Sequence, residues 1–187
     1  MNVYHVGFSV IETPDIHFGR KNADFGQGFY VSPNKEFSQK WGKKRKGLDT
    51  VFNEYVLKED SLNIKTFSRD KEWFDYIFNN RHNKEDYLAN YDVIIGPIAN
   101  DTIYDTWGIL TSGLIPDDIA LEVLTCGPEY TQVVLKTQKA VDNLQFVSSH
   151  IIPESDLTQY STAVRDEEQD YQNQLSEILD RHPDLFS

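Results

Sequence analysis

The spacing of short strand-like segments constrains the fold of this chain more than any other feature. Each segment is only a few residues long and is rich in β-branched or aromatic side chains. These segments are residues 2–6, 28–31, 51–56, 63–66, 93–96, 131–136 and 144–147. They do not alternate regularly with helices long enough to cross over between parallel strands. The pattern therefore predicts an α+β fold and argues against a doubly wound parallel sheet.

Three shorter helices are expected between the strands. Ser32 and Pro33 have the residue types of an N-cap and a first helical position, and the helix that follows is predicted to end at Gly42. Apolar spacing indicates two further helices, over residues 70–78 and 116–124.

The C-terminal part of the chain differs in charge from the rest. The whole chain has a formal net charge of −12, and residues 151–187 contribute −7 of it through nine acids and two bases. Helical apolar spacing predicts one long amphipathic helix over residues 155–181, with Ser155 as N-cap and an acidic run at 166–170 that could interrupt it. We therefore expect a domain over residues 1–150 and an acidic helical extension over residues 151–187. The apolar stripe of that helix would pack on the domain or contact a protein partner.

Composition narrows the classes of protein that fit. A pI near 4.7 opposes non-specific binding to nucleic acid, although five bases gather between Lys40 and Lys46. That basic run is either a solvated helix end or a site that attracts phosphate, and the acidic helix could fold against it. Cys126 has no partner for an internal disulfide, and the five histidines lack paired metal-ligand spacing. With no apolar run of membrane length and no leader pattern, the expected compartment is the cytoplasm, with no membrane partner and no metal.

The segment over residues 24–32 is the most informative for function. Gly26 and Gly28 bracket Gln27 and lead directly into an aromatic strand. Such glycines permit either a close bend against a neighbouring strand or a close approach to a ligand. The segment is not a dinucleotide fingerprint, because no third glycine opens a following helix. Arg20 and Asp24 are candidates for shaping a loop beside a ligand.

The order of several residues along the chain resembles a known superfamily. His5 is followed by Gly7 at the end of the first predicted strand, and Trp41 lies eleven residues after Tyr30. This order is similar to that of the ADP-ribosyltransferase superfamily, in the branch of diphtheria toxin and the poly(ADP-ribose) polymerases. More narrowly, the sequence looks like a bacterial family of unknown function that is grouped with these transferases, in residues 4–5, 24–30 and 91–97. The resemblance covers about residues 3–148 and implies a split pair of antiparallel sheets with flanking helices and a cleft for NAD.

The resemblance also implies roles for individual residues. The residues that it assigns to NAD binding are His5, Val6, Gly7, Gly28, Tyr30 and Trp41. In this scheme His5 holds the adenine-side ribose, and Tyr30 and Trp41 lie against the two faces of nicotinamide. The structural alternative is that these side chains fill the core, with Trp41 paired to Phe37 one helical turn away. NAD would be a substrate, and no metal would be required.

The late strand departs from the superfamily pattern. Gln132 stands where the polymerases carry a glutamate that stabilises the oxocarbenium-like charge on the ribose. Replacing that charge by an amide is expected to cost about 2 to 4 kcal/mol of barrier. The catalytic candidates are Gln132, Tyr30 and Glu129, the last as a carboxylate supplied from the preceding loop. A polar turn at Asn100, Asp101 and Thr102 is a further candidate for lining the pocket.

The expected function is therefore mono-ADP-ribosyl transfer from NAD to a macromolecular acceptor, either protein or nucleic acid, with release of nicotinamide. Chain extension to a polymer is not expected, because Gln132 cannot act as the base that activates a further ribose hydroxyl. Three alternatives remain open at this point: an NAD glycohydrolase, an NAD-binding module that has lost its chemistry, and a protein-interaction module.

Overall fold

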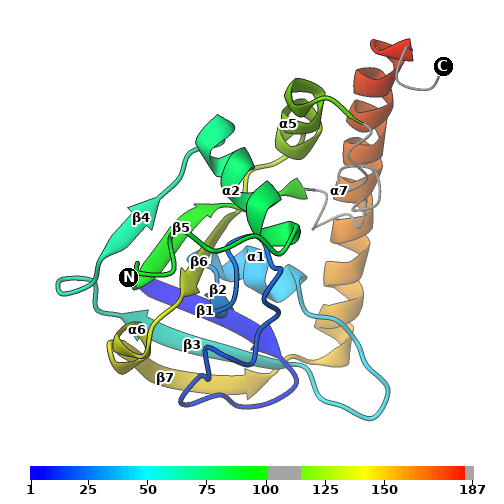
Figure 1. Cartoon of the computed structure of the whole chain (residues 1–187). Helices are drawn as coiled ribbons and strands as arrows, with labels where there is room; N and C mark the ends of the chain where they lie inside the picture. Colours follow the sequence, from blue (N-terminus) through cyan, green and yellow to red (C-terminus); the bar gives the residue numbers. More distant parts are fainter. Residues whose placement is uncertain (101–114, 184–187) are drawn as a thin grey trace.

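Two small sheets form the centre of the protein (Figure 1). The computed structural model describes residues 1–100 and 115–183. The first sheet is antiparallel throughout and has the order β1 (Asn2–Gly7), β3 (Val51–Leu57), β7 (Leu144–Ile151). The second sheet has the order β2 (Phe29–Val31), β6 (Thr131–Leu135), β5 (Val93–Pro97), β4 (Ile64–Thr66). The predicted α+β class is thus confirmed, and each expected strand is present within a few residues of its expected limits.

The second sheet departs from a purely antiparallel arrangement. β4 pairs in parallel with β5, whereas the other pairs in this sheet are antiparallel. The chain passes from β4 to β5 through α2 (Lys71–Arg81), and a helical crossover of this kind delivers the second strand in the same direction as the first. The expectation of two antiparallel sheets is therefore wrong for this edge of the second sheet.

The helix after β2 begins later than the sequence predicts. α1 spans Lys35–Lys40, and Asn34 is its N-cap, with a side chain that accepts a hydrogen bond from the Phe37 N–H at 2.9 Å. Ser32 does not cap the helix: its hydroxyl donates to the Thr131 carbonyl of β6 at 2.8 Å and accepts from the N–H of Asn34, the N-cap residue, at 3.2 Å. Ser32 thus joins the end of β2 to β6, and the helix begins after Asn34.

The remaining short helices differ only slightly from expectation. α2 is capped by Asp70, whose side chain accepts from the Trp73 N–H, and it runs three residues further than predicted. α5 spans Asp117–Thr125. α6 (Gln138–Asp142) was not expected from the sequence, since five residues are too few to show a helical period.

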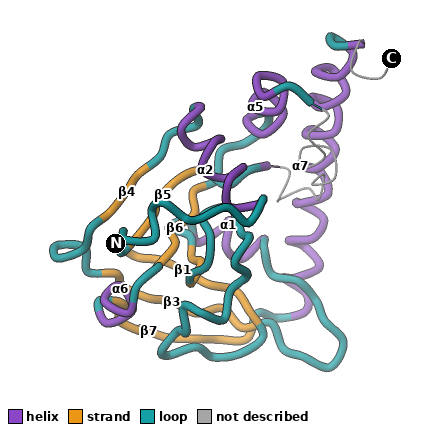
Figure 2. The backbone as a smooth tube through the Cα atoms, in the orientation of Figure 1, coloured by secondary structure: helices purple, strands orange, loops and turns teal. Residues whose placement is uncertain are grey.

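The long C-terminal helix is continuous through its acidic run. α7 spans Glu154–Asp180, and Pro153, not Ser155, occupies the N-cap position. It runs along one side of the molecule beside α1 and α5 (Figures 1 and 2). None of the helices in the described ranges is both long and apolar enough to cross a membrane.

The core has two main parts, on opposite faces of the second sheet. Val133 faces a cluster shared with the first sheet, and Val134 faces a cluster shared with α2, α5 and α7. Tyr171 of α7 is 0% exposed in that second cluster, together with Leu175 and Ile178. The apolar stripe of α7 therefore packs on the body of the protein.

Candidate functional site

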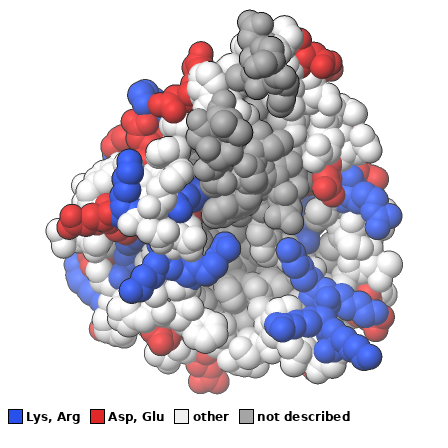
Figure 3. Space-filling model, turned by 45° about the vertical axis from the view of Figure 1, so that its right-hand side comes forward, with Lys and Arg blue, Asp and Glu red and all other residues white. Residues whose placement is uncertain are grey.

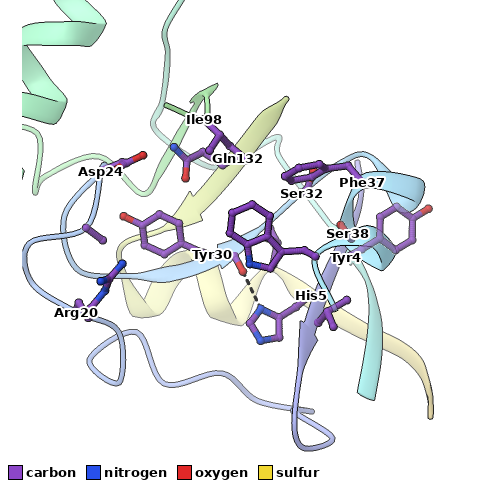
Figure 4. Close-up of a pocket in the computed structure, with 14 residues that line it drawn as sticks. Tyr4, His5, Arg20, Asp24, Tyr30, Ser32, Phe37, Ser38, Ile98 and Gln132 are labelled. Carbon is purple, nitrogen blue, oxygen red and sulfur yellow. Dashed lines mark hydrogen bonds between the residues drawn. The ribbon is translucent and has the colours of Figure 1, made fainter. Parts of the chain in front are cut away.

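A cavity of about 270 Å³ lies where β1, β2, α1 and the beginning of β6 meet (Figure 4). Five of the residues predicted to form the site line it, namely His5, Val6, Tyr30, Trp41 and Gln132. The other lining residues are Tyr4, Arg20, Ala23, Asp24, Val31, Ser32, Phe37, Ser38 and Ile98. Segments that are far apart in sequence thus converge on one space.

Strand pairing explains why these side chains meet. Tyr4 and Ser32 exchange two backbone hydrogen bonds of 2.9 Å, which joins β1 to the end of β2 and brings His5 beside Tyr30. Tyr30 lies directly opposite Val134 in the β2–β6 pair. Because side chains two residues apart on a strand share a face, Tyr30 and Gln132 lie on the same face of the second sheet.

His5 is held in one tautomer. Its Nδ1 lies 2.9 Å from the Tyr30 backbone oxygen, and because a carbonyl oxygen only accepts, Nδ1 carries the proton (Figure 4). Burial lowers the pKa of His5, and the carbonyl contact opposes this only in part. The ring is therefore neutral at pH 7, and Nε2 is left as a hydrogen-bond acceptor.

The Tyr30 hydroxyl is fixed at both of its hydrogen-bonding positions. It donates to the Gly26 carbonyl at 2.7 Å and accepts from the Phe25 N–H at 3.0 Å. Burial, reinforced by the nearby Asp24 carboxylate, raises the pKa of Tyr30 well above its ordinary value. Tyr30 is thus a neutral ring held in one orientation, and its hydroxyl is not a proton acceptor.

The loop that holds Tyr30 is itself anchored by buried charges. Asp24 forms an ion pair of 2.9 Å with Arg81 of α2, and both side chains are almost completely buried. Lys136 donates to the Phe25 carbonyl at 2.5 Å and pairs with Asp86. These contacts tie the loop that holds Tyr30 to α2 and to the residue that follows β6.

Gln132 presents its amide oxygen as an acceptor. The side chain is almost fully buried, and Nε2 donates to the Pro97 carbonyl at 3.3 Å. Since that carbonyl cannot donate, the nitrogen must face Pro97, and this assignment leaves Oε1 for a ligand. An acceptor without negative charge therefore stands at position 132 in the lining of the cavity.

Trp41 lies at the rim of the cavity and is 37% exposed. It packs against Phe37 with ring centroids 5.5 Å apart, and Phe37 stacks on Tyr130 at 4.1 Å. A second cavity of about 340 Å³ lies between α1 and α7 and shares Phe37 and Trp41 with the first. Trp41 therefore packs against Phe37 and also lines the cavity.

Three predicted site residues do not line the cavity. A Cβ added to Gly28 would lie 2.6 Å from the Leu135 carbonyl oxygen, so this glycine permits close strand packing. A Cβ on Gly7 would lie 3.1 Å from His5 Nε2, so its absence keeps that nitrogen open. Glu129 is 58% exposed, and its carboxylate lies 3.8 Å from Arg69 Nε.

The polar turn expected near the pocket is only partly described. Asp101 and Thr102 lie outside the described residues. Asn100 is fully buried, and its side chain donates to the Cys126 and Pro128 carbonyls. Asn100 therefore supports the loop before β6 and does not line the cavity.

Sequence reasoning missed several lining residues. Tyr4, Ser32, Ser38 and Ile98 were not predicted, and Phe37 was expected only as a packing partner of Trp41. One signal was available for Phe37, because residues four apart on a helix share a face. Ser38 lies on the same helix, whereas Tyr4, Ser32 and Ile98 come into the site through backbone pairing between distant segments, which the sequence does not specify.

The basic run after α1 is partly neutralised by α7. Lys40 pairs with Glu167 at 2.8 Å, and Lys44 pairs with Glu154. Residues 43–46 are exposed, and Lys and Arg side chains gather on the lower part of the face shown in Figure 3. Within the described ranges, no group of three or more His, Cys, Asp or Glu side chains is placed to hold a metal ion.

Comparisons with known proteins give one match. No curated protein matches the chain, and no solved structure matches it. A family model described as "Protein of unknown function (DUF3990)" matches residues 1–146. That range contains β1 to β6 and every residue that lines the cavity, and it ends before α7. The chain therefore belongs to the DUF3990 family of proteins of unknown function.

Proposed function

We propose that this protein binds NAD in the cavity and transfers ADP-ribose from it to a macromolecular acceptor, with release of nicotinamide. The observation that carries the proposal is the convergence of His5, Tyr30, Trp41 and Gln132 on one cavity. Their order along the chain is the order found in the ADP-ribosyltransferases. We propose the cytoplasm as the compartment, because Cys126 has no internal disulfide partner.

The chemistry of the lining supports this ligand. His5 Nε2 accepts a hydrogen bond from a ribose hydroxyl, and the rings of Tyr30 and Trp41 contact the planar nicotinamide. The volume of about 270 Å³ lies just below the range of about 300 to 1,000 Å³ that is usual for ligand pockets. The cavity therefore takes the nicotinamide end of NAD, with the adenine-side ribose at His5 on its lining, and the adenine ring extends beyond it.

The proposed reaction breaks one bond and forms another. Nicotinamide leaves with the electron pair of its bond to C1″, and positive charge develops on the ribose. The partial negative charge on Gln132 Oε1 opposes that developing charge, less strongly than a carboxylate would. A nucleophile of the acceptor then bonds to C1″ and loses its proton to solvent. The scheme uses no metal.

The neutral side chain of Gln132 favours an NAD-binding module as a second candidate, because the amide would then stabilise the transition state too weakly for turnover. A further candidate is an NAD glycohydrolase, in which water replaces the macromolecular acceptor. These candidates share the cavity and differ in their products.

Incubation with NAD labelled in its adenylate part separates the candidates. The protein is mixed with a cell lysate, the protein and nucleic-acid fractions are counted separately, and released nicotinamide is measured in parallel. Transfer predicts label in one fraction together with nicotinamide. Nicotinamide and free ADP-ribose alone indicate hydrolysis, and binding without nicotinamide indicates a module without turnover.

Two variants connect the result to the cavity. His5→Ala and Trp41→Ala are expected to weaken NAD binding, since both side chains line the cavity. His150→Ala is the matched control, because His150 is exposed on β7 and lies outside the cavity lining. If wild-type protein binds no NAD by calorimetry, the proposed function is wrong.

A further inference from the structure

One carboxylate of α7 reaches two segments that build the candidate cavity. Glu167 accepts a hydrogen bond from Lys40 Nζ of α1 at 2.8 Å through Oε1. Its Oε2 accepts from the Tyr130 hydroxyl, also at 2.8 Å. α1 packs against α7, as Figure 1 shows. A single side chain thus joins α7, α1 and the residue that precedes β6.

Tyr130 carries this contact to the aromatic wall of the cavity. Its ring stacks on Phe37, with centroids 4.1 Å apart and an interplanar angle of 21°. Phe37 in turn packs on Trp41, and both of these side chains line the cavity. Glu167 does not line the first cavity, so any effect that it has on a ligand there is indirect.

The backbone of Tyr130 links the same contact to the opposite side of the cavity. Its carbonyl accepts from the Ile98 N–H at 2.7 Å, and Ile98 lines the cavity. Gln132 follows Tyr130 by two residues on the chain. The position of Tyr130 therefore influences both the aromatic wall and the strand that carries Gln132.

The Glu167 contacts are well suited to holding these groups in place. The side chains of Lys40 and Glu167 are only 19% and 27% exposed. The hydrogen bond that Lys40 donates to Glu167 is the main cause that raises the pKa of Lys40, so the ammonium stays charged. Charge-assisted hydrogen bonds are shorter and stronger than neutral ones, and shielding from water limits their screening.

We propose that Glu167 is a positioning residue that fixes Phe37 and Trp41 through Tyr130 and Lys40. Through this role of Glu167, α7 becomes a functional part of the site, although the helix lies beyond the residues that match the family. The effect on NAD rests on the proposed function, whereas the effect on the position of Trp41 does not.

The position of Trp41 can be measured without any ligand. Protein labelled with 5-fluorotryptophan gives one fluorine resonance for each of its three tryptophans, and Trp41→Phe and Trp73→Phe assign two of them. Glu167→Gln keeps the size of the side chain but loses its charge and one acceptor, and it is expected to shift or broaden the Trp41 resonance. The buried Trp73 is expected to keep its resonance, which shows that the core is intact.

Two further variants complete the design. Tyr130→Phe removes only the hydroxyl and is expected to shift the Trp41 resonance in the same way. Asp166→Asn is the matched control, because it removes the same charge from an exposed neighbour on α7 and should leave the resonance unchanged. An unchanged Trp41 resonance in both Glu167→Gln and Tyr130→Phe would overturn the inference.

Calorimetry with NAD gives the functional readout. Glu167→Gln and Tyr130→Phe are each expected to weaken NAD binding about three- to thirtyfold, with a melting temperature close to that of Asp166→Asn. If the wild type does not bind NAD but the Trp41 resonance moves as expected, the proposed function fails and the positioning role stands. If NAD binds equally well to all variants and the resonance does not move, the positioning role fails and the proposed function stands.

Discussion

His5 of the first sheet donates a hydrogen bond from Nδ1 to the backbone oxygen of Tyr30 in the second sheet, with 2.9 Å between the two atoms. The bond crosses between the sheets at the edge of the cavity. It fixes the tautomer of the imidazole and leaves Nε2 as an acceptor. Since Gly7 has no side chain to crowd that nitrogen, the arrangement suits a ligand that donates a hydrogen bond there.

The depressed pKa of His5 predicts a loss of stability in mild acid. Burial lowers the pKa of His5, so the folded protein binds a proton at this site less readily than the unfolded chain. Above its unfolded pKa of about 6.5, His5 is neutral in both states and does not change the free energy of unfolding. As the pH falls below that value, the unfolded chain binds a proton more readily than the folded protein, so the free energy of unfolding decreases. Urea unfolding at pH 7.5 and 5.5 should show a larger loss for the wild type than for His5→Gln. An equal loss in the two proteins would contradict the prediction.

Restoring a carboxylate at position 132 is expected to raise NAD cleavage, about thirty- to a thousandfold if the full charge is recovered. The site is buried and faces the Pro97 carbonyl, so a glutamate there has a raised pKa and gains its charge only as the pH rises. Gln132→Glu should therefore cleave NAD faster at pH 8.5 than at pH 6, measured by nicotinamide release. Gln132→Leu should be slower than the wild type at both values.

Glu129 provides a contrasting test of the catalytic assignment. Its exposed carboxylate lies beside Arg69 and outside the cavity lining, so Glu129→Gln is expected to change nicotinamide release less than twofold. If this substitution abolishes the activity while Gln132→Leu leaves it unchanged, the carboxylate that matters comes from the loop before β6.

Gly28 is expected to contribute to strand packing and not to ligand binding. The Cβ of Gly28→Ala would approach the Leu135 carbonyl oxygen to 2.6 Å and Val134 Cγ1 to 2.7 Å, which forces β2 away from β6. The expected loss is about 1 to 3 kcal/mol in the free energy of unfolding, measured in urea beside the exposed control Gln159→Ala. A variant of normal stability that no longer binds NAD would instead indicate direct contact between this glycine and the ligand.

The packing of α7 predicts that the first 150 residues are unstable without it. Tyr171, Leu175 and Ile178 are buried in the same cluster as side chains of α2 and α5. Tyr171→Ala is expected to lose about 3 to 5 kcal/mol in the free energy of unfolding, against little change for the exposed control Asp170→Ala. Truncation after His150 should give an aggregated product. A soluble, folded product that binds NAD would show that α7 is an accessory helix.

Most individual elements were predictable because their signals are local. Val51 to Leu57 shows the β-branched and aromatic composition of a strand, and Asp70 caps a helix three residues before Trp73. The aromatic strand entered at Gly28 could be recognised in the same way. The resemblance to the ADP-ribosyltransferases named five members of the cavity lining, and the two loop candidates Arg20 and Asp24 line it as well, although the roles of all seven remain predictions.

Tertiary structure alone decided the features that depend on distant partners. Ser32 has the right residue type for an N-cap, but Asn34 caps the helix, and the Ser32 hydroxyl links Thr131 of β6 to the Asn34 N–H. The link from Glu167 to Tyr130 likewise spans 37 positions. Local sequence determines which backbone conformations are low in energy. The partner of a polar side chain, in contrast, is whichever group the folded chain brings within about 3 Å of it. Local pattern therefore determined the strands and helices of this protein, and the packing of its sheets and α7 decided which side chains share the cavity.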